Sequence, residues 1–497
     1  MTTTYRHKIW RFILAVLFFS SCKKQIEIPP PAISISSANV FTNDQTAISV
    51  LTGLYIDISK GYNTAGYFAG NSGLSVMLGL SADELTLYDM GSASYNTFYS
   101  NIFASDRQGI NYWSPLYAYI FRCNSAIEGL NDPSAEALTP FIRKQLLGEA
   151  TFMRAFFYFY LTSMYGDLPL ALTTDYKVNT LLARSPQTQI CQQIITDLKA
   201  AIELLAVEYP DVTLLKTTTE RVRPTQWAAR ALLARMYLHI GDNANAEHES
   251  SAIIENTLFS LPTVLNDVFL KTSSEAIWQV QPVTAFFNTD DARAFVLTEF
   301  GPTSTADNPV YLSQSLLNSF EPGDLRHVGK NWVDSIIIGG ITYFFPYKYK
   351  DNLYNSSITG IDGPQYMTEY QMMLRLAEQY LIRAEARAKQ NNLTGAITDI
   401  DMIRERAGLP LIIDSNPGIS QIALLDAILH ERQVELFTEY GHRWFDLKRT
   451  GKVDEVMSIV TPIKSQGTSQ WETHQQFFPI PKSDLDKAPN LTQTNGY

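Results

Sequence analysis

The chain has few of the residues that build metal centres and disulfide frameworks. Its 497 residues include only three cysteines, Cys22, Cys123 and Cys191, whose spacing matches neither a zinc site nor a disulfide pattern. No pair among its seven histidines has the spacing of helical metal ligands. We therefore expect no metal ion and no cofactor. Cys123 lies in the apolar stretch YAYIFRCNSAI and is interpreted as a buried core thiol.

Positive charge is also scarce. The chain carries 39 basic and 50 acidic residues, a net charge of −11, and contains no basic run. A polyanion would be repelled by this field, so the composition argues against nucleic acid as a partner. With 45% hydrophobic and 18% charged residues, the composition is that of a globular protein.

No apolar run reaches the length of a membrane-spanning helix. The run Phe12–Phe19 is far shorter than the ~20 residues that a span needs. Three basic residues precede it, and two serines and Cys22 follow it, which is the order of a secretory signal peptide. We predict removal of residues 1–21 and acylation of Cys22, as in a bacterial lipoprotein. The alternative is a plain signal peptide beside an incidental cysteine.

A lipid anchor and a spacer follow from that prediction. Each buried methylene of an acyl chain contributes about 0.8 kcal/mol, so several chains on Cys22 would hold the protein firmly on a bilayer. Residues 22–38 contain the sequence KKQIEIPPPAISISS, which is rich in proline and serine. This composition predicts an extended, flexible tether between the anchor and the folded body.

Signatures of catalysis are missing. The sequence contains no GxSxG elbow, no Walker loop and no HExxH motif. Two pairs of adjacent acids, Asp83 with Glu84 and Asp290 with Asp291, could in principle serve glycoside hydrolysis. Adjacent acids in loops are more often solvated surface groups or helix caps, and we interpret them so. We expect a binding protein and not an enzyme.

Helical periodicity dominates what is present. Apolar residues recur at spacings of three and four in the segments 47–58, 146–164, 227–238, 377–388 and 397–407. Thr42 or Asn43 can cap the first helix, and Gly166 and Gly241 end the second and third. Short turns such as NNLTG make helix pairs that resemble tetratricopeptide units, unevenly spaced along the chain. The sequence predicts a mainly α fold in which the helices form a scaffold.

Two stretches, about 60–115 and about 260–370, have a different composition. Glycine, asparagine, serine and threonine alternate there with aromatic residues, as in GYNTAGYFAGNSG. The second stretch also contains the strand-like runs EAIWQVQP and SIIIGGITYFFPYKYK. Long irregular segments in a compact domain are usually functional surfaces.

The segment Ile428–Lys452 is dense in charge of both signs among large apolar residues. Its charged residues include Glu431, Arg432, Glu435, Arg443, Asp446 and Arg449. A charged active site is one interpretation. We favour the other, a semi-buried salt-bridge network that pins helix ends through paired arginine hydrogen bonds.

Taken together, these segments resemble the SusD/RagB family of outer-membrane nutrient-binding lipoproteins. The resemblance runs from Cys22 to Tyr497. It is carried by VFTNDQTAISVLTGLY, RAFFYFYLTSMYGDLPL, WAARALLARMYLHIGDNANA, AEQYLIRAEARAKQNN, ERQVELFTEYGHRWFDLKRTGK and the C-terminal FFPIPKSDLDKAPNLTQTNGY. The order and spacing of these pieces make the resemblance specific.

The resemblance implies a SusD-like fold of four tetratricopeptide-like helix pairs with irregular loops and a few short strands. Residues 39–225 would be an N-terminal SusD-like region and residues 226–497 a C-terminal RagB/SusD region, together one body. It further implies a lipid-anchored protein on the outside of the cell outer membrane. Such a protein would cap a TonB-dependent β-barrel transporter (SusC-like) and deliver a nutrient into it, a glycan as our first choice and a peptide as our second.

The ligand site has to be predicted from chemistry, because ligand contacts in the family come from variable loops. Aromatic rings stack on the apolar faces of sugars, while Asn, Asp and Arg bind the hydroxyl groups. The candidates for ligand binding are Tyr67, Phe68, Tyr88, Tyr95, Tyr99, Phe286, Phe287 and Trp332. Three alternatives remain open: a peptide-binding RagB-like subunit, a helical envelope scaffold that binds only protein and, least favoured, an all-helical glycosidase.

Overall fold

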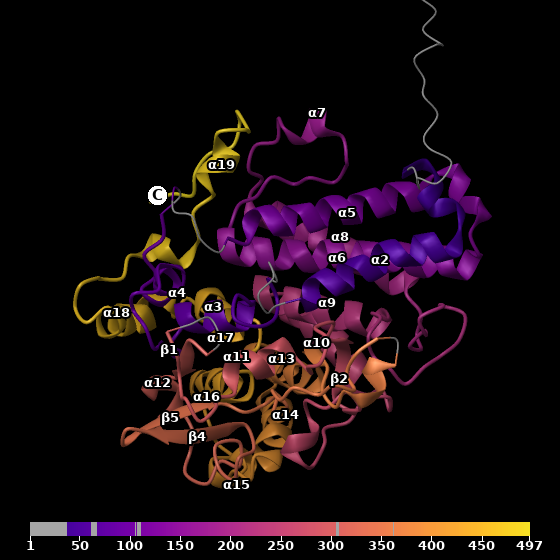
Figure 1. Cartoon of the computed structure of the whole chain (residues 1–497). Helices are drawn as coiled ribbons and strands as arrows, with labels where there is room; N and C mark the ends of the chain where they lie inside the picture. The colour runs from indigo at the N-terminus through magenta and orange to yellow at the C-terminus, as the bar shows by residue number, and fades with distance from the viewer. Residues whose placement is uncertain (1–36, 61–66, 105, 107–110, 305–307, 361) are drawn as a thin grey trace, which may run out of the picture.

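The chain folds around a stack of helices whose apolar stripes face one another (Figure 1). The computed structural model describes residues 37–60, 67–104, 106, 111–304, 308–360 and 362–497. The predicted signal peptide, Cys22 and the tether as far as residue 36 lie outside the described residues. No helix in the described part of the chain is both long and apolar enough to cross a membrane.

The stack is built from neighbouring helices, as the periodicity predicts. Its members are α2 (Asp44–Ser59), α5 (Trp113–Asn131), α6 (Pro140–Tyr165), α8 (Gln187–Leu204), α9 (Gln226–Ile240), α10 (Asn243–Ile254), α13 (Leu376–Lys389), α14 (Leu393–Arg406) and α16 (Gln421–Glu435). Helix α6 packs between α5 and α8, α9 follows α8, and α10 follows α9. Helix α13 then packs on α10, α14 and α16. The mainly helical fold is therefore confirmed.

Helix ends lie where the sequence places them. Asn43 caps α2, since its side-chain oxygen accepts from the backbone N–H groups of Gln45 and Thr46. Gly166 ends α6 with a φ of 76°, and Gly241 ends α9 in the left-handed conformation with a φ of 78°. The uneven spacing of the helix pairs also has a visible cause. Residues 255–375, which carry loops and strands, separate α10 from α13 in the sequence, and within them β2 packs back on α9 and α2.

The strands form three separate two-stranded antiparallel sheets. They are β1 (Leu85–Leu87) with β3 (Val310–Leu312), β2 (Ala276–Val280) with β6 (Gln371–Arg375), and β4 (Val333–Ile338) with β5 (Ile341–Pro346). The β2–β6 pair is buried, whereas β4 alternates between buried and exposed residues. Gly339 and Gly340, both with positive φ, make the tight turn between β4 and β5. Both strand-like runs of the sequence are confirmed as strands.

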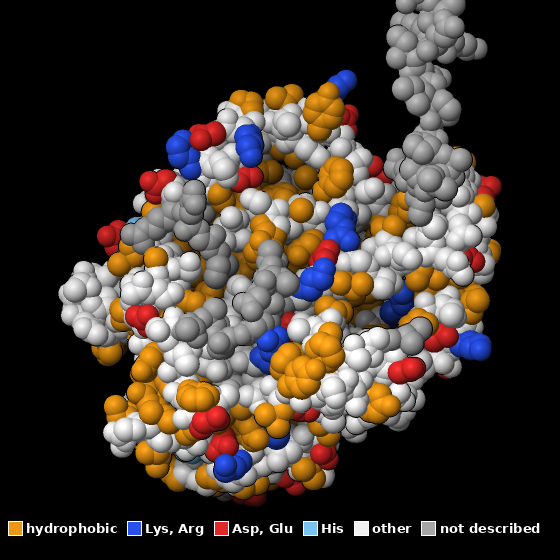
Figure 2. Space-filling view, viewed as in Figure 1, with side chains coloured by type: hydrophobic (Ala, Val, Ile, Leu, Met, Phe, Trp, Pro, Cys, Tyr) orange, Lys and Arg blue, Asp and Glu red, His pale blue; other side chains and the backbone are white. Residues whose placement is uncertain are grey.

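Shorter helices and turns complete the fold. The short α-helices are α3 (Leu74–Ser81), α4 (Ala93–Tyr99), α7 (Tyr176–Asn179), α11 (Asp290–Phe295), α12 (Gln314–Leu317), α15 (Ile412–Ser415), α17 (His442–Arg449), α18 (Val453–Lys464) and α19 (Lys482–Leu485). The 3-10 turns are η2 (Ser37–Thr42), η3 (Pro133–Ala137), η4 (Leu265–Asp267), η5 (Gly363–Tyr366) and η6 (Thr473–Gln476). Figure 2 shows hydrophobic side chains in a hollow of the surface, near α5, α7 and α19.

The charged segment 428–452 forms a buried ion-pair network, as predicted. Arg432 donates to Asp446 at 2.8 Å, and Arg449 donates to both Asp446 and Glu385 at 2.7 Å. Glu435 accepts from Arg375 at the end of β6 at 2.6 Å. Because a charge buried alone is costly, each of these pairs fixes the relative position of the elements that carry it. The network joins α16 and α17 to the sheet and the stack.

Candidate ligand-binding site

Four of the predicted ligand-binding aromatics belong to the core. Phe68 and Trp332 are fully buried, and Tyr95 and Tyr99 on α4 are nearly so. Phe68 packs its ring against Phe156, Phe157 and Tyr160 of α6. These four candidates are core residues in the structure, so their rings have little or no surface to offer to a ligand.

Trp332 has a further reason to be buried. Its ring lies among three cations, with Lys348 Nζ 4.9 Å from the ring centroid and the guanidinium carbons of Arg375 and Arg406 each 5.7 Å away. Its indole N–H donates to the Leu265 carbonyl at 3.0 Å. The ring therefore stabilises buried arginines and a lysine through its π-face and has no face to offer to a sugar.

The other four candidates keep surface exposure. Tyr67 is half-buried and packs its edge against Tyr112, with ring centroids 5.9 Å apart. Tyr88 is 46% exposed. Phe286 and Phe287 are half-buried and lie together in the loop that leads to α11.

Phe286, Phe287 and Tyr354 form an aromatic platform. The Phe286 and Tyr354 rings are stacked, with centroids 5.0 Å apart and planes 30° from parallel. Phe287 meets Tyr354 edge to face at 5.9 Å. Tyr354 is 63% exposed, so a broad aromatic face is open to solvent. A rigid, partly exposed aromatic surface of this kind suits the apolar face of a sugar ring.

The backbone at the platform is strained and held in place. Phe286 has a φ of 73°, a left-handed conformation that is unusual for a bulky residue. Its N–H donates to the carbonyl of Ile358, and its carbonyl accepts from the N–H of Asn355 at 2.8 Å. Both loops of the platform are thus tied to each other. Such strain persists where the surroundings enforce it, and it is concentrated at functional sites.

The buried side-chain amide of Asn288 also connects the same two loops. Asn288 donates to Asp351 at 2.6 Å and accepts from the N–H of Thr368 at 2.8 Å. Glu369 accepts from the N–H of Lys350 at 2.7 Å, and burial raises the pKa of its carboxyl group to about 7. These contacts hold the two loops in a fixed position relative to β6. The platform is preorganised and does not depend on a ligand to bring its rings together.

Arg293 supplies a cationic group beside the platform. Its guanidinium lies 4.1 Å from the centroid of the Phe287 ring and donates to Asp290 at 3.0 Å. Partial burial lowers the pKa of Arg293 somewhat, and the charge of Asp290 counteracts this. A guanidinium and a carboxylate next to aromatic rings can bind the hydroxyl groups of a sugar whose ring stacks on the platform.

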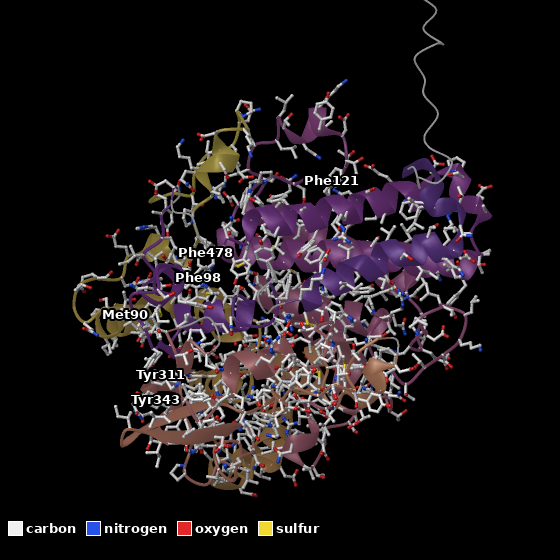
Figure 3. All side chains as sticks on the ribbon, viewed as in Figure 1. Met90, Phe98, Phe121, Tyr311, Tyr343 and Phe478 are labelled. Carbon is white, nitrogen blue, oxygen red and sulfur yellow. The ribbon has the colours of Figure 1, made fainter. Side chains whose placement is uncertain are left out.

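Tyrosines also gather at the edge of the small sheets. Tyr311 and Tyr343 meet edge to face at 5.1 Å, and Tyr88 meets Tyr343 at 6.2 Å. Residues on β3 and β5, and the residue just after β1, supply the three rings (Figure 3). We call Tyr88, Tyr311 and Tyr343 the tyrosine patch. It is a second aromatic surface on which a ligand or a protein partner could rest.

The adjacent acids are buried, which corrects the interpretation as solvated groups. Asp83 forms an ion pair with Arg443, and burial together with the charge of Asp83 raises the pKa of Glu84 to about 8. Asp291 accepts from the N–H of Gly70 at 2.7 Å and from Gln371 at 2.6 Å, and burial raises its pKa to about 7. These contacts tie distant segments together.

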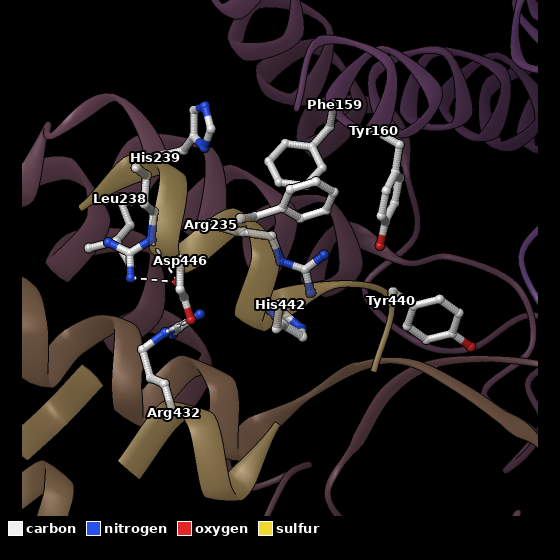
Figure 4. A pocket seen from close by; sticks show the side chains of 11 residues that line it. Phe159, Tyr160, Arg235, Leu238, His239, Arg432, Tyr440, His442 and Asp446 are labelled. Carbon is white, nitrogen blue, oxygen red and sulfur yellow. Dashed lines mark hydrogen bonds and ion pairs between the residues drawn. The ribbon is translucent and has the colours of Figure 1, made fainter. Parts of the chain in front are cut away.

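A small cavity lies between α6, α9 and α17 (Figure 4). Its lining includes Tyr160, Arg235, His239, His442 and Asp446. The cavity has a volume of about 20 Å³, room for about one water molecule. Burial lowers the pKa of His239 to about 4, so this histidine is neutral at physiological pH. The cavity belongs to the buried charge network and is too small for a nutrient. Among the described residues, no three metal-ligating side chains gather.

Sequence reasoning missed Tyr354, Arg293, Tyr311 and Tyr343. Tyr354 lies in DNLYNSSITG, a segment with the same loop composition as the stretches that were singled out. That composition could have identified Tyr354 as a candidate. Its stacking on Phe286 could not be predicted, since the two residues come from loops that only the tertiary structure brings together.

Two family models match the chain. A model described as the SusD family covers residues 308–497, and a model described as starch-binding associating with outer membrane covers residues 81–238. Among relatives, SusD-like protein P2 of Formosa agariphila is 25% identical over 539 aligned positions, covering 98% of this chain and 99% of the relative. A SusD-like protein of Bacteroides ovatus is 24% identical and covers 89% of this chain and 82% of the relative.

Solved structures share the fold. A SusD superfamily protein from Bacteroides vulgatus superposes with a TM-score of 0.74 at 22% identity, covering 91% of this chain and 99% of that one. A laminarin binding SusD-like protein gives 0.71 at 22% identity, with 92% and 100% covered. Surface glycan-binding protein A from Bacteroides uniformis gives 0.72 at 19% identity, with 91% and 99% covered.

Proposed function

This chain belongs to the SusD/RagB family, and from that premise we propose that it is a cell-surface lipoprotein that binds a glycan and passes it to a TonB-dependent outer-membrane transporter. Binding is its role in this proposal, with no catalytic step. The Phe286–Phe287–Tyr354 platform, with Arg293 beside it, is the proposed glycan site.

The single observation that carries the glycan site is the locked stack of Phe286 on Tyr354. Tyr354 is exposed and stacks on Phe286, whose backbone is strained, and strain of this kind is typical of functional sites. Two structural neighbours support a carbohydrate as the ligand, since one is named as laminarin binding and the other as surface glycan-binding. The tyrosine patch is a second surface available to a longer glycan or to the transporter.

The anchor and the location rest on the sequence and on the family. The order of residues 1–22 predicts a signal peptide and an acylated Cys22, and one matching family model describes proteins that associate with the outer membrane. An acylated Cys22 at the end of the tether would keep the body at the membrane surface, within reach of a β-barrel partner.

Glycan binding is tested by removing one ring of the platform. We would titrate the non-acylated protein with oligosaccharides of laminarin and of starch, in the wild type and in Tyr354→Ala. Loss of a stacking ring should weaken binding about tenfold, which corresponds to ~1.4 kcal/mol. Tyr176→Ala is the matched control, because Tyr176 is 70% exposed on α7 and lies outside the platform. Equal affinities of the wild type and Tyr354→Ala would exclude the platform as the site. Binding of peptides but of neither glycan would favour the RagB-like peptide role.

The anchor and partner are tested in membranes. Wild-type protein should partition with the outer membrane and co-purify with a large β-barrel protein after gentle solubilisation. Cys22→Ala should be released from the membrane fraction. If Cys22→Ala remained membrane-bound and unprocessed, the lipoprotein proposal would fail. Soluble helical partners in place of a barrel would favour the scaffold alternative.

A further inference from the structure

The hollow near α5 is an apolar groove with no role in the proposed glycan site. It has a volume of about 280 Å³ and lies between α5, the segment 169–182 and the C-terminal residues around α19. Its lining includes Trp113, Tyr117, Phe121, Leu182, Ala488 and Leu491. Phe121 lies on α5, below the loop that carries α7 (Figure 3). Groove residues this apolar are normally covered in the working protein.

The floor of the groove is an aromatic ladder. Trp113, Tyr117 and Phe121 follow one another at intervals of four along α5 and therefore lie on one face of the helix. The rings of Trp113 and Tyr117 have centroids 4.9 Å apart, and Phe121 is 50% exposed. The Tyr117 hydroxyl donates to the Pro169 carbonyl at 2.8 Å, which fixes one wall of the groove against its floor.

Polar groups accompany the ladder. The side-chain carbonyl of Asn179 is buried and has no hydrogen-bond partner among the described residues. Asp484 and Lys487 line the groove from the C-terminal side. The groove therefore offers aromatic faces together with an acceptor and a cationic donor. Extended proline-rich segments bind to surfaces of this kind, because their rings pack on aromatic faces while their backbone groups stay free for hydrogen bonds.

This chain carries such a segment in its sequence, directly before η2. Residues 23–36 read KKQIEIPPPAISIS, with three consecutive prolines and four isoleucines. The body begins at η2, which contacts α5, and the Phe41 ring packs against Gly129 near the C-terminal end of that helix. The tether therefore starts at one end of α5, and the aromatic ladder occupies the other half of the same helix.

The lengths agree. In an extended polyproline conformation, the chain from Ser37 back to Pro31 spans about 19 Å. Along α5, the distance from Gly129 back to Tyr117 is about 18 Å. A tether that runs back along α5 would thus be long enough to bring the prolines to the partly buried Tyr117, and Ile33 to Phe121, the exposed ring of the ladder; Trp113 is only 3% exposed.

We propose that the groove is an intramolecular docking site for the chain's own tether, residues 26–35, with Pro29–Pro31 on the aromatic ladder. Backbone carbonyls of the docked segment accept from Lys487, and a backbone N–H donates to Asn179. Between the anchor and the docked segment, only the short piece from Cys22 to Gln25 then stays free. The docking does not depend on glycan binding. Its consequence, a fixed orientation of the body at the membrane, rests on the proposed anchor at Cys22.

Hydrogen exchange tests the docking in the full mature chain. We would use residues 22–497 with Cys22→Ser, without glycan or membrane, and a synthetic peptide of residues 23–36 as the reference for an undocked tether. Amides of Ile26–Ile35 should exchange at least about tenfold more slowly in the protein than in the peptide. Phe121→Glu, and separately the replacement of Pro29–Pro31 by serine, should remove that protection.

A matched control separates docking from a general loss of structure. Phe141 is 48% exposed in the first turn of α6 and does not line the groove, so Phe141→Glu should leave tether protection unchanged. All variants should keep the wild-type melting temperature within a few degrees. Peptide-like exchange of the tether in the wild-type chain would overturn the proposal. So would a tether that stays protected in Phe121→Glu. Protection of residues 173–182 that appeared only when laminarin was added would overturn it too, and would make the groove a second glycan site.

Discussion

Arg443 on α17 and Asp83 just before β1 form an ion pair through two hydrogen bonds, with N–O distances of 2.8 and 2.9 Å. The two residues are 360 positions apart in the sequence. Both side chains are buried, and the charge of Arg443 keeps the pKa of Asp83 below its usual range although burial alone would raise it. The pair ties the loop region of the N-terminal half to the charged segment of the C-terminal half.

Removing Arg443 should destabilise the whole protein. Arg443→Ala leaves the Asp83 carboxylate buried without its partner, which costs about 3–5 kcal/mol. Urea unfolding followed by circular dichroism measures the change. Lys482→Ala breaks the exposed pair with Asp486 and should cost no more than about 1 kcal/mol. A similar small effect for both variants would show that the buried pair does not hold the two halves together.

Glu385 should make the protein sensitive to acid. Burial alone would raise the pKa of this carboxyl group, but the charge and the paired hydrogen bonds of Arg449 hold it at about 2. Since the folded pKa lies below the unfolded one, this stabilisation is complete above about pH 4.5 and is lost as the pH falls towards 2, by up to about 3 kcal/mol. The Glu385→Gln variant has no carboxyl group at this position, so this contribution to its stability does not depend on pH.

The test is the unfolding free energy of both proteins from pH 7 to pH 3. At neutral pH the wild type should be the more stable of the two, and the difference should shrink only below pH 4.5. A difference that stays constant down to pH 3 would contradict the assignment of the acid sensitivity to this pair.

The two described cysteines should be unreactive in the native protein. Burial raises the pKa of the Cys123 thiol to about 12 and that of Cys191 to about 11, so the reactive thiolate is scarce at neutral pH. In a Cys22→Ser protein, a thiol reagent should label neither cysteine until denaturant is added, and then both. Rapid labelling of Cys123 without denaturant would show that the α5–α6 interface opens readily.

Arg293 should not be replaceable by lysine at the glycan platform. The planar guanidinium lies against the Phe287 ring and also donates to Asp290, two contacts that a lysine ammonium cannot reproduce together. Arg293→Lys should therefore weaken glycan binding about tenfold with little change in melting temperature. Lys452→Arg, a conservative change at an exposed pair with Asp426, is the control. Undiminished binding by Arg293→Lys would remove Arg293 from the site.

Much of the scaffold could be predicted because it depends on local signals. The cap at Asn43 and the glycine stops at Gly166 and Gly241 act within a few residues of the backbone that they satisfy. The charged segment after Ile428 was correctly interpreted as a structural network, because closely spaced arginines and carboxylates among large apolar residues can be buried only as pairs.

The binding surface was harder to predict, because an aromatic residue in a loop packs inward as readily as it faces solvent. Trp332 and Phe68 were named as candidates for ligand binding and lie in the core, while Tyr354 was overlooked and is exposed. The burial of the adjacent acids was not predicted for the same reason. Asp291 accepts hydrogen bonds from Gly70 and Gln371, which are far away in the chain.

The sequence by itself determined the mainly helical class, the buried faces of the helices that it predicted, and the ends at Asn43, Gly166 and Gly241. These follow from periodicity, caps and composition, which act over short distances along the chain. The tertiary structure alone decided which aromatic rings meet at the surface. Phe286 stacks on Tyr354, and the ladder of α5 lies open beside the C-terminal residues, because loops from remote segments converge there. Packing of that kind is set by the whole fold and leaves no local pattern in the sequence.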